Sequence, residues 1–546
     1  MRVALLQTNP TIGALEDNVT ELAEAYRAVA ADAELAVAPE LAICGYAPRD
    51  VLERERFLDA VRGALEDLAR HTESGPPLLV GAPIRTPWES GKPAQNAAVL
   101  LEGGRVREAR AKSLLPTYDV FDERRWFEPA REREVLEVAG ARVGVIICED
   151  LWTDDELLGQ RPYKVDPVDE LARAGVDLAV CLSASPFHGG KQRLREHLIS
   201  RAARRFGAPL VYVNQVGAHD ELIFDGQSVA VDAEGHVVAR LRAFERESRV
   251  VDLDRAAPLG ASNASLEEMV WRALVLGVRD YVRRTGFTRA LIGLSGGIDS
   301  AVTAAIACDA LGAANVRGVT MPSVYSSEGS VTDAEALADN LGIPCACVPI
   351  QPAVDALRGM LATELPTYAS DVTEQNIQAR TRGVTLMALS NDTNALVLTT
   401  GNKSELAVGY CTLYGDMCGA LSVLSDVPKT LVYRLAEWRN REGEVIPRAT
   451  IDKPPSAELA PGQVDQDTLP PYEVLDAIIE GYVDEARGID ELVEGLGLER
   501  ALVARIVGMI DRNEYKRRQA APGLRVTTKA FGDGRRMPIA CKIAAR

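Results

Sequence analysis

The stretch LIGLSGGIDSAV, residues 291–302, joins an apolar run directly to a polar segment with two adjacent glycines and then resumes an apolar pattern of helical period. This junction predicts a buried strand over 289–294, a tight turn through SGGIDS and a helix over 299–311. The alternation continues with strands over 315–321 and 345–349 and a helix over 329–341. Strands that alternate with helices of this length form βαβ units, so residues 259–546 are predicted to fold as a doubly wound parallel sheet.

Residues 1–258 show a second α/β pattern. Short β-rich runs such as VALLQ, PLLVGAP, RVGVIICED and PLVYVNQ alternate with helical stretches over 16–32 and 191–206, which predicts well-covered sheets. The segment DRAAPLGASNASLEEM then interrupts the pattern with small residues, Pro and Gly. We place the domain boundary there, at 258, with Ser265 and Glu268 as a capping box that starts the next helix.

Composition and charge exclude several classes of function. The formal net charge of −18 repels a phosphate backbone, so nucleic acid is not expected as the main partner. No uncharged run approaches the length of a bilayer span, and MRVALLQTNP lacks the apolar core and cleavage site of a signal peptide. Neither the nine cysteines nor the five histidines show zinc-site spacing. A cytoplasmic protein without membrane or nucleic-acid partners is therefore expected.

The SGGIDS turn has the chemistry of an anion cradle. Open α/β sheets bind ligands at the carboxyl edge of their strands, where this turn falls. Its glycines allow close backbone approach, the amides at the helix start suit phosphate oxygens, and Ser295 and Ser300 add hydroxyl groups. Asp299 beside phosphates calls for a cation, so it is predicted to bind Mg²⁺ that bridges to pyrophosphate. The alternative is an ordinary strand-to-helix turn with Asp299 as an N-terminal helix charge.

SGGIDS resembles the signature of the ATP pyrophosphatases, which include GMP synthetase, asparagine synthetase and NAD synthetase. Downstream, and in order, MPSVYSSEGSVTDA, EQNIQARTRG, TTGNKSELAVGYCTLYGDMCG, KPPSAELAPGQVDQDTLPPYEVLD and EYKRRQAAPGLRVTTKAFGDGRR resemble NAD synthetases in particular. The resemblance implies that ATP is a co-substrate with Mg²⁺, that the carboxylate of deamido-NAD⁺ is activated as an adenylate, and that ammonia then displaces AMP to give NAD⁺.

The same resemblance assigns residues in the second domain. The ATP-binding set is Gly293, Leu294, Ser295, Gly296, Gly297, Ile298, Asp299, Ser300 and Thr400. The positions similar to deamido-NAD⁺ contacts are Asn376, Glu405 and Lys516. Asp299 and Glu405 are the expected metal ligands, and Lys403 and Lys429 are further candidate charge partners. Taken singly, each Lys or Glu would more often be part of a surface ion pair.

Cys148 ends the apolar strand in RVGVIICEDLW. A lone cysteine is more often an inert core residue than a nucleophile. The segments PELAICGY, KSLLPTYDVFDERRWF and SASPFHGGK, however, resemble the nitrilase superfamily, which implies an αββα sandwich and a Glu-Lys-Cys triad of Glu40, Lys112 and Cys148. In amide hydrolysis Cys148 would attack the carboxamide and Glu40 would carry the proton. Lys112 would stabilise the oxyanion and lower the pKa of the thiol.

Resemblance to glutamine-dependent NAD synthetases further implies that Tyr118, Ser185 and Lys191 bind glutamine, with Glu123 as an orienting residue in the same site. One departure is His219, which stands where the pattern has Gln. Ammonia made in the first domain would be protonated if it escaped into water, so an internal route to the second site is expected. The resemblance also implies a homo-oligomer, from a dimer up to an octamer.

Two rival interpretations are open. The chain could amidate another carboxylate, as GMP and asparagine synthetases do, although the blocks from 399 to 476 favour deamido-NAD⁺. It could also be a nucleotide-binding regulator with an inactive amidase domain. A regulator has no need of a nucleophile and its base, so the presence of Glu40, Lys112 and Cys148 argues against this second reading.

Overall fold

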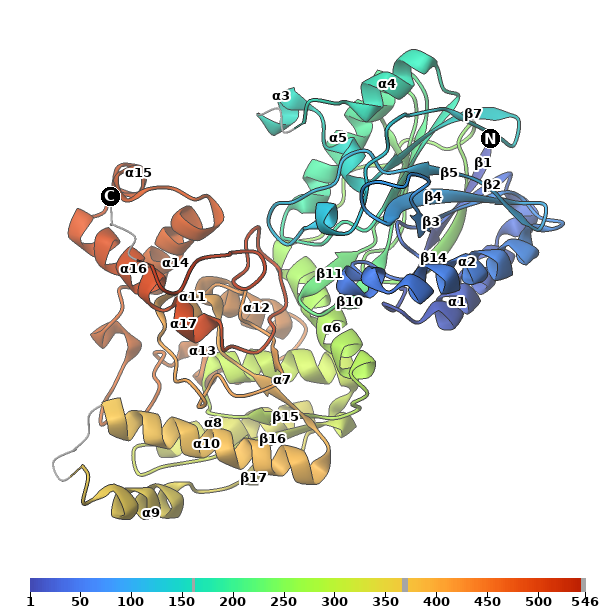
Figure 1. Cartoon of the computed structure of the whole chain (residues 1–546). Helices are drawn as coiled ribbons and strands as arrows, with labels where there is room; N and C mark the ends of the chain where they lie inside the picture. Colours follow the sequence, from blue (N-terminus) through green and yellow to red (C-terminus); the bar gives the residue numbers. More distant parts are fainter. Residues whose placement is uncertain (160–162, 366–371, 542–546) are drawn as a thin grey trace. The chain divides into compact units, whose positions relative to one another are not determined.

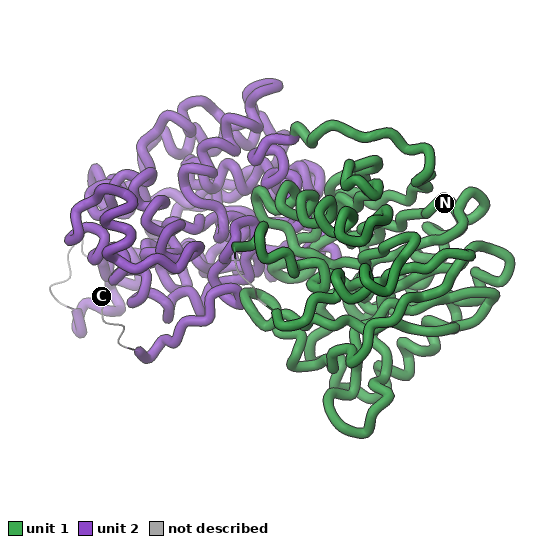
Figure 2. The backbone as a smooth tube through the Cα atoms, turned by 90° about the horizontal axis from the view of Figure 1, so that it is seen from above, with its two compact units in different colours: residues 1–263 green, residues 264–546 purple. Residues whose placement is uncertain are grey.

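The computed structural model describes residues 1–159, 163–365 and 372–541, and in these ranges the chain divides into two compact units, residues 1–263 and 264–546 (Figure 2). The division falls in the same segment, rich in small residues, where the sequence placed the boundary at 258. None of the helices in the described ranges is both long enough and apolar enough to span a bilayer.

The first unit is built on facing sheets (Figure 1). One sheet has the order β14-β1-β2-β3-β4-β5 and the other β13-β12-β9-β8-β7-β6, while β10 and β11 pair as a separate ribbon. The strands of the first sheet are β14 (Glu247–Asp252), β1 (Arg2–Gln7), β2 (Leu35–Val37), β3 (Leu78–Arg85), β4 (Ala94–Glu102) and β5 (Arg105–Ala111). Those of the second are β13 (Val237–Arg240), β12 (Val229–Val231), β9 (Leu210–Asn214), β8 (Leu178–Ser183), β7 (Ala141–Ile147) and β6 (Leu136–Val138). The ribbon is β10 (Val216–His219) with β11 (Leu222–Asp225).

Apolar side chains on both faces of the sheets create four layers. Alternate residues of β1, such as Val3 and Leu5, pack into an inner core with residues of β7 and β9 from the opposite sheet, because successive strand side chains point to opposite faces. On the outer faces α1 (Leu15–Arg27) and α2 (Glu55–Ala69) cover the first sheet, and α4 (Pro167–Ala174) and α5 (Lys191–Phe206) cover the second. This αββα sandwich confirms the predicted fold of the N-terminal half.

The second unit contains a parallel sheet of order β17-β16-β15-β18-β19. Its strands are β15 (Ala290–Gly293), β16 (Val316–Thr320), β17 (Cys345–Cys347), β18 (Leu396–Thr399) and β19 (Leu421–Ser422). The chain leaves β15 toward β16 on one side and later returns to β18 on the other, so SGGIDS lies at the switch point where such sheets bind ligands. The predicted doubly wound parallel sheet is confirmed.

Helices cover this sheet and extend it. The helices between its strands are α7 (Ile298–Leu311), α8 (Glu328–Leu341), α9 (Gln351–Leu361), α10 (Val372–Thr393) and α11 (Lys403–Val408). The preceding helix is α6 (Leu266–Arg284), and the following ones are α12 (Lys429–Asn440), α13 (Arg448–Asp452), α14 (Tyr472–Ile479), α15 (Ile489–Leu496), α16 (Arg500–Arg512) and α17 (Glu514–Arg517). A separate apolar cluster joins α14, α15 and α16 to α11, so the C-terminal helices are anchored to the segment that carries Glu405.

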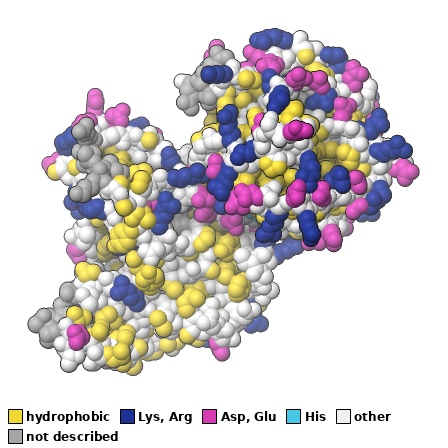
Figure 3. All heavy atoms as spheres, viewed as in Figure 1, with side chains coloured by type: hydrophobic (Ala, Val, Ile, Leu, Met, Phe, Trp, Pro, Cys, Tyr) yellow, Lys and Arg dark blue, Asp and Glu magenta, His cyan; other side chains and the backbone are white. Residues whose placement is uncertain are grey.

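Local expectations agree with the structure in most places. Ser265 caps α6, and its side chain accepts a hydrogen bond from Glu268 N at 3.2 Å. The helix expected over 16–32 is shorter, because α1 ends at Arg27 and is followed by a 3₁₀ turn, Ala30–Asp32. On the face drawn in Figure 3, basic and acidic side chains of the first unit are interspersed.

Gly81 in β3 allows the backbone that carries Glu40 to approach closely. Gly81 N donates to Pro39 O at 3.1 Å, and Ile43 N donates to Gly81 O at 3.2 Å. A Cβ atom on Gly81 would lie 2.3 Å from Leu41 N and 2.4 Å from Pro39 O. Because backbone atoms cannot yield as a flexible side chain does, only glycine fits here.

We therefore expect Gly81→Ala to lower the free energy of unfolding of the first unit by about 1–3 kcal/mol, the usual cost of overpacking. Thermal and urea unfolding measure this change. The matched control is Gly63→Ala in α2, where an added Cβ meets no atom within 4 Å and alanine should stabilise the helix by about 0.5–1 kcal/mol. Equal stability of the two variants would contradict the packing argument.

Candidate active sites

In the first unit, Lys112 is held between the carboxylates of Glu40 and Glu123. Its Nζ atom lies 2.8 Å from Glu40 Oε1 and 2.7 Å from Glu123 Oε1. Lys112 is 1 % exposed and Glu40 is fully buried. Burial alone would lower the pKa of Lys112, but the two carboxylate charges raise it well above its ordinary value. The ammonium is therefore a fixed positive charge in a nearly dry site.

Each predicted member of this group follows the end of a strand. Glu40 comes after β2, Lys112 follows β5, and Cys148 begins the turn after β7. Glu40 is oriented by further donors: Asn96 Nδ2 donates to its Oε1 at 2.7 Å and Ala184 N to its Oε2 at 2.9 Å. The structure thus brings together side chains that lie up to 108 positions apart in the sequence.

Glu123, for which an orienting role was expected, shares the Lys112 ammonium and accepts a hydrogen bond from Tyr46 OH at 2.9 Å. Burial raises the pKa of Glu123 to about 7, and the Glu40 charge adds to this rise while the charge of Lys112 opposes it. Glu123 therefore gains or loses its proton near neutral pH, whereas an ordinary glutamate is ionised there.

The Cys148 thiol is neutral in this arrangement, although the Lys112 charge lowers its pKa as expected. Burial and the Glu40 charge raise the pKa above its ordinary value, and the lowering effects of Lys112 and a hydrogen bond with Ser183 are smaller. Burial of the thiol is the largest of these effects. Attack by this thiol requires transfer of its proton to a base.

The sequence did not single out Asp150, which fixes the turn of the nucleophile. Its carboxylate accepts hydrogen bonds from Ile147 N at 3.1 Å, Leu114 N at 2.8 Å and Ser113 N at 3.1 Å. Asp150 is 2 % exposed, and burial raises its pKa to about 7. It ties the Cys148 turn to the segment after Lys112. The available signal was a pair of acidic residues directly after the apolar strand in RVGVIICEDLW.

Glu149 is a second residue that the sequence reasoning missed. It is buried directly after Cys148, and it accepts hydrogen bonds from Tyr118 OH at 3.0 Å and from Tyr163 OH at 2.7 Å. Burial raises its pKa, whereas the Tyr163 hydrogen bond and the charges of Lys112 and Lys191 lower it. A carboxylate held beside the nucleophile is suited to an ammonium group of a substrate.

The other residues expected to bind glutamine lie in the same unit. Ser185 is buried, and its backbone N donates to Asn214 Oδ1 at 2.8 Å. Lys191 Nζ donates to Pro186 O at 2.8 Å and lies 5.6 Å from the centroid of the Trp152 ring. The Lys191 charge lowers the pKa of Glu149. These two opposite charges therefore lie close enough to interact.

His219 is buried and its ring contacts other residues of the first unit. Its Nε2 atom is 2.8 Å from Pro10 O, and its ring packs edge-on against Phe224. It also lines a small cavity of about 30 Å³ that Tyr46, Glu123 and Trp126 border. The histidine that departs from the expected Gln therefore packs behind the Lys112 group.

In the second unit, Lys429 is held between Asp299 and Glu405. Its Nζ atom lies 2.5 Å from Asp299 Oδ2 and 3.1 Å from Glu405 Oε1, and Lys429 is 2 % exposed. Burial would lower the pKa of Lys429, but the Asp299 and Glu405 charges raise it. Burial raises the pKa of Glu405 to about 7; Asp299 and Asp465 raise it further, and Lys429 opposes them. The predicted metal ligands thus converge on one ammonium.

The SGGIDS turn depends on a glycine at positive φ and on hydrogen bonds within the loop. Gly296 has φ +75, and a Cβ atom there would lie 2.3 Å from Ser330 O. Gly297 is the N-cap of α7, and its N donates to Ser295 Oγ at 3.2 Å. Ser300 Oγ donates to Gly297 O at 2.9 Å. Of the remaining residues of the expected set, Gly293 ends β15, Leu294 follows that strand, and Ile298 begins α7.

Asn402 connects this turn to the segment with Glu405. Its Nδ2 atom donates to Asp299 Oδ1 at 2.9 Å, and its Oδ1 accepts from Glu405 N at 3.0 Å as the cap of α11. Thr400 follows β18, the strand beside β15, and so lies at the same sheet edge. Backbone and side-chain bonds therefore join the SGGIDS and TTGNKSE segments into one site.

The remaining candidates of the second unit bond mainly to the protein itself. Asn376 Oδ1 accepts from Thr412 Oγ1 at 2.9 Å, and Lys516 Nζ donates to Gly409 O at 2.7 Å and Cys411 O at 2.8 Å. Lys403 is 1 % exposed and pairs with Asp426 at 3.2 Å and Asp484 at 3.0 Å. Lys403 is thus an internal anchor rather than a partner for a ligand charge.

Comparison with known proteins gives the same division of the chain. Residues 2–257 match the family model for carbon-nitrogen hydrolase, and residues 270–520 match that for NAD synthase. A glutamine-dependent NAD(+) synthetase of Synechocystis sp. is 48% identical over 98% of this chain and 98% of its own length. The enzyme of that name from Thermotoga maritima is 43% identical over 99% of this chain and 98% of its own length.

Solved structures agree with this result. The glutamine-dependent NAD+ synthetase from Acinetobacter baumannii, solved in complex with ADP, has a TM-score of 0.77 at 38% identity and covers 100% of this chain and 99% of its own. A structure of the same description from Cytophaga hutchinsonii has a TM-score of 0.84 at 22% identity, covering 99% of this chain and 97% of its own, which supports the fold.

The raised pKa of Glu123 gives a testable pH dependence. Because its pKa rises from 4.5 to about 7 on folding, the folded protein binds this proton more tightly than the unfolded chain. The resulting stabilisation is complete below about pH 4.5 and is lost as the pH rises through about 7.

Glu123→Gln cannot titrate, so the wild-type protein should lose stability relative to this variant as the pH rises from about 4.5 to above 7. Urea unfolding of both proteins across this range measures the difference between their free energies of unfolding. A difference that stays constant with pH would show that Glu123 has an ordinary pKa.

Proposed function

The chain belongs to the glutamine-dependent NAD(+) synthetases, and from this premise we propose which residues carry each half of the reaction. The family reaction is an ATP-consuming ligation in which ammonia from glutamine amidates deamido-NAD⁺. The N-terminal unit supplies the ammonia and the C-terminal unit forms NAD⁺. The observation that carries the assignment of residues is the buried Lys112 ammonium shared by Glu40 and Glu123 in the carbon-nitrogen hydrolase unit.

In the glutaminase, Cys148 attacks the side-chain carboxamide of glutamine. Its thiol is neutral, so Glu40 takes the proton as the C–S bond forms and returns it to the departing ammonia. A water molecule then hydrolyses the γ-glutamyl thioester to glutamate, and Cys148 recovers its proton. The Lys112 ammonium has three N–H groups, and the two carboxylates use two, which leaves one for the oxyanion of the tetrahedral intermediate.

Recognition of glutamine uses charges of both signs. Glu149, held by Tyr118 and Tyr163, suits the α-ammonium of the substrate, and Lys191 suits its α-carboxylate. Ser185 adds a hydroxyl group from the turn after β8. A pair of opposite charges favours a free amino acid over a simple amide, because a simple amide lacks the ammonium and carboxylate groups that Glu149 and Lys191 would bind.

In the synthetase, ATP binds to the loop from Gly293 to Ser300 and also to Thr400. The carboxylate of deamido-NAD⁺, near Asn376, Glu405 and Lys516, attacks the α-phosphorus, pyrophosphate leaves, and the adenylate forms. Ammonia then adds to the activated carbonyl, and AMP departs with the electron pair of its C–O bond. A free carboxylate has no adequate leaving group, which is why ATP is consumed.

The donor set of Asp299 and Glu405 fits Mg²⁺. Both offer carboxylate oxygens, the ligands this ion prefers, and they already converge on one positive charge. Among the described residues, no three His, Cys, Asp or Glu side chains gather around a metal position, so phosphate oxygens of the substrate would complete the shell. When bound, the ion offsets the negative charge of the triphosphate.

Three further proposals rest on the family resemblance. The protein forms a homo-oligomer of at least two copies, ammonia passes internally from one unit to the other, and the reaction takes place in the cytoplasm. Sedimentation velocity of the purified protein tests the first of these, since a monomer at micromolar concentration excludes it.

Substitution at one residue of each unit separates the two half-reactions. Cys148→Ala should lower glutamine-dependent NAD⁺ synthesis by at least about 10³-fold, because the nucleophile is lost, and leave ammonia-dependent synthesis intact. Asp299→Asn should lower both rates together. NAD⁺ formation with glutamine and with ammonium chloride is the measurement.

The matched control is Cys44→Ala, which removes a buried thiol of the same unit that packs in the outer core with residues of α1 and α2. It should retain glutamine-dependent synthesis. Continued use of glutamine by Cys148→Ala would overturn the assignment of the nucleophile.

A further inference from the structure

Three consecutive residues at the end of β8, Ser183 to Ser185, each hold a different part of the glutaminase. Ser183 follows Leu182, which pairs with Ile147, so Ser183 and Cys148 are neighbours at the ends of β8 and β7, and a hydrogen bond with Ser183 lowers the pKa of the thiol. The backbone N of Ala184 donates to Glu40 Oε2 at 2.9 Å. Ser185 is the expected glutamine contact. All three are buried, so we call this segment the 183–185 turn and ask what fixes it.

Asn214, the last residue of β9, fixes Ser185. Its Oδ1 atom accepts a hydrogen bond from Ser185 N at 2.8 Å. Its Nδ2 atom donates to Gly226 O at 3.0 Å and to Asp225 Oδ1 at 3.3 Å. Because the amide nitrogen faces acceptors and the amide oxygen faces a donor, only one orientation of this fully buried side chain satisfies all partners.

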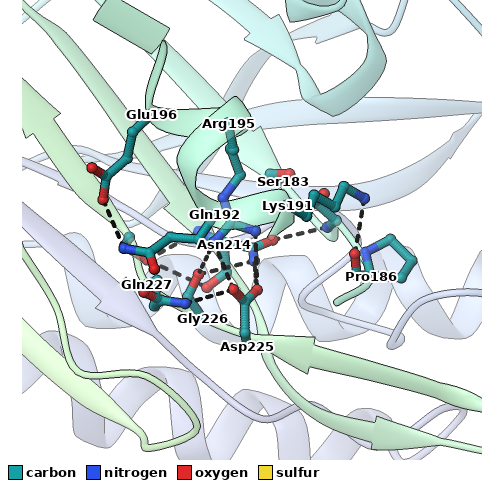
Figure 4. Close-up of polar contacts among 12 residues, drawn as sticks. Ser183, Pro186, Lys191, Gln192, Arg195, Glu196, Asn214, Asp225, Gly226 and Gln227 are labelled. Carbon is teal, nitrogen blue, oxygen red and sulfur yellow. Dashed lines mark hydrogen bonds and ion pairs between the residues drawn. The ribbon is translucent and has the colours of Figure 1, made fainter. Parts of the chain in front are cut away.

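Asp225 is in turn held by Arg195 on α5 (Figure 4). Arg195 Nη1 lies 3.0 Å from Asp225 Oδ1 and Nη2 lies 2.8 Å from Oδ2, a bidentate pair in which each side chain is 1 % exposed. Burial works to lower the pKa of Arg195, but the charges of Asp225 and Tyr212 and the hydrogen bonds to Asp225 together hold it above its ordinary value. Buried pairs of this kind stabilise a fold weakly, but they impose one geometry on their neighbours.

Tyr212 fixes Ser183 from the same side. Tyr212 OH and Ser183 Oγ are 2.7 Å apart, and the Arg195 guanidinium lies 5.6 Å from the centroid of the Tyr212 ring. Two branches therefore start at Arg195. One passes through Asp225 and Asn214 to Ser185, and the other passes through Tyr212 to Ser183.

We propose that Asn214 and Tyr212 are positioning residues of the glutaminase, which hold the 183–185 turn so that it presents the Ser183 hydroxyl to Cys148 and the Ala184 N–H to Glu40. This inference rests on the proposed roles of Cys148 and Glu40. Neither Asn214 nor Tyr212 touches the substrate in this scheme; both act through the turn. A displacement of about 1 Å at reacting groups can lower a rate by about 10²-fold.

The test uses the full-length protein with Asn214→Ala and Tyr212→Phe. We expect Asn214→Ala to lower kcat for glutamine hydrolysis by about 10- to 100-fold and Tyr212→Phe by about 3- to 10-fold, with KM for glutamine changed by less than about threefold. Ammonia-dependent NAD⁺ synthesis should be unchanged. A diazoketone analogue of glutamine should label Cys148 completely but more slowly, since misplaced groups react slowly whereas unfolded molecules do not react.

Gln227→Ala is the matched control. Gln227 Nε2 donates to the same carboxylate, at 2.8 Å from Asp225 Oδ2, but it has no bond to the 183–185 turn. The rival explanation is that Asn214 matters only as a hydrogen-bond donor to Asp225. In that case Gln227→Ala and Asn214→Ala will lose equal activity, and the proposal fails. It also fails if both Asn214→Ala and Tyr212→Phe retain wild-type kcat. Should Asn214→Ala not fold, the milder Tyr212→Phe decides, since it removes a single oxygen atom.

Failure of this inference is distinguishable from failure of the proposed function. Wild-type hydrolysis of glutamine that Cys148→Ala abolishes supports the function by itself. If that result holds while the Asn214 and Tyr212 variants behave as wild type, only the positioning roles are wrong.

Discussion

A buried lysine ammonium shared by two carboxylates is the interaction on which both sites depend. Lys112 between Glu40 and Glu123 organises the N-terminal unit, and Lys429 between Asp299 and Glu405 organises the C-terminal unit. In each group burial raises the pKa of one glutamate to about 7, Glu123 in the first and Glu405 in the second. Removing one partner from such a group leaves an unbalanced buried charge, which strongly destabilises the folded protein. Each group therefore keeps its geometry before a substrate arrives, and that geometry is what the proposed chemistry uses.

The sheets bring these groups together from distant parts of the sequence. Glu40, Lys112 and Cys148 each follow a strand of the sandwich, while Asp299 follows the turn after β15 and Asn402 follows β18. Hydrogen bonds between the segments that follow these strands then hold the side chains in place. Asp150 joins the Cys148 turn to the segment after Lys112, and Asn402 joins Asp299 to α11. The core supplies rigidity, and the bonds between strand ends supply the alignment.

The sequence predicted the fold class because hydrophobic alternation and the SGGIDS break are local signals. It also indicated Glu40, Lys112 and Cys148 through the segments around them. It could not reveal Asp150 or Glu149, because a carboxylate beside the nucleophile looks like any charged residue until burial and partners are known. The neutral Cys148 thiol has the same origin: the sequence shows neither that the thiol is buried nor that the Glu40 charge lies near it. Lys403 was expected among charge partners for ligands, and only the structure shows it enclosed by Asp426 and Asp484. Such outcomes depend on tertiary contacts, which no local pattern contains.

The central claim is that each lysine serves its own half-reaction. The most direct measurement compares Lys112→Met and Lys429→Met, assaying glutamate release from glutamine and pyrophosphate release from ATP with deamido-NAD⁺ and ammonium chloride. The account predicts that Lys112→Met loses glutamate release and keeps pyrophosphate release, whereas Lys429→Met loses pyrophosphate release and keeps glutamate release. Wild-type glutamate release by Lys112→Met, or wild-type pyrophosphate release by Lys429→Met, would contradict it.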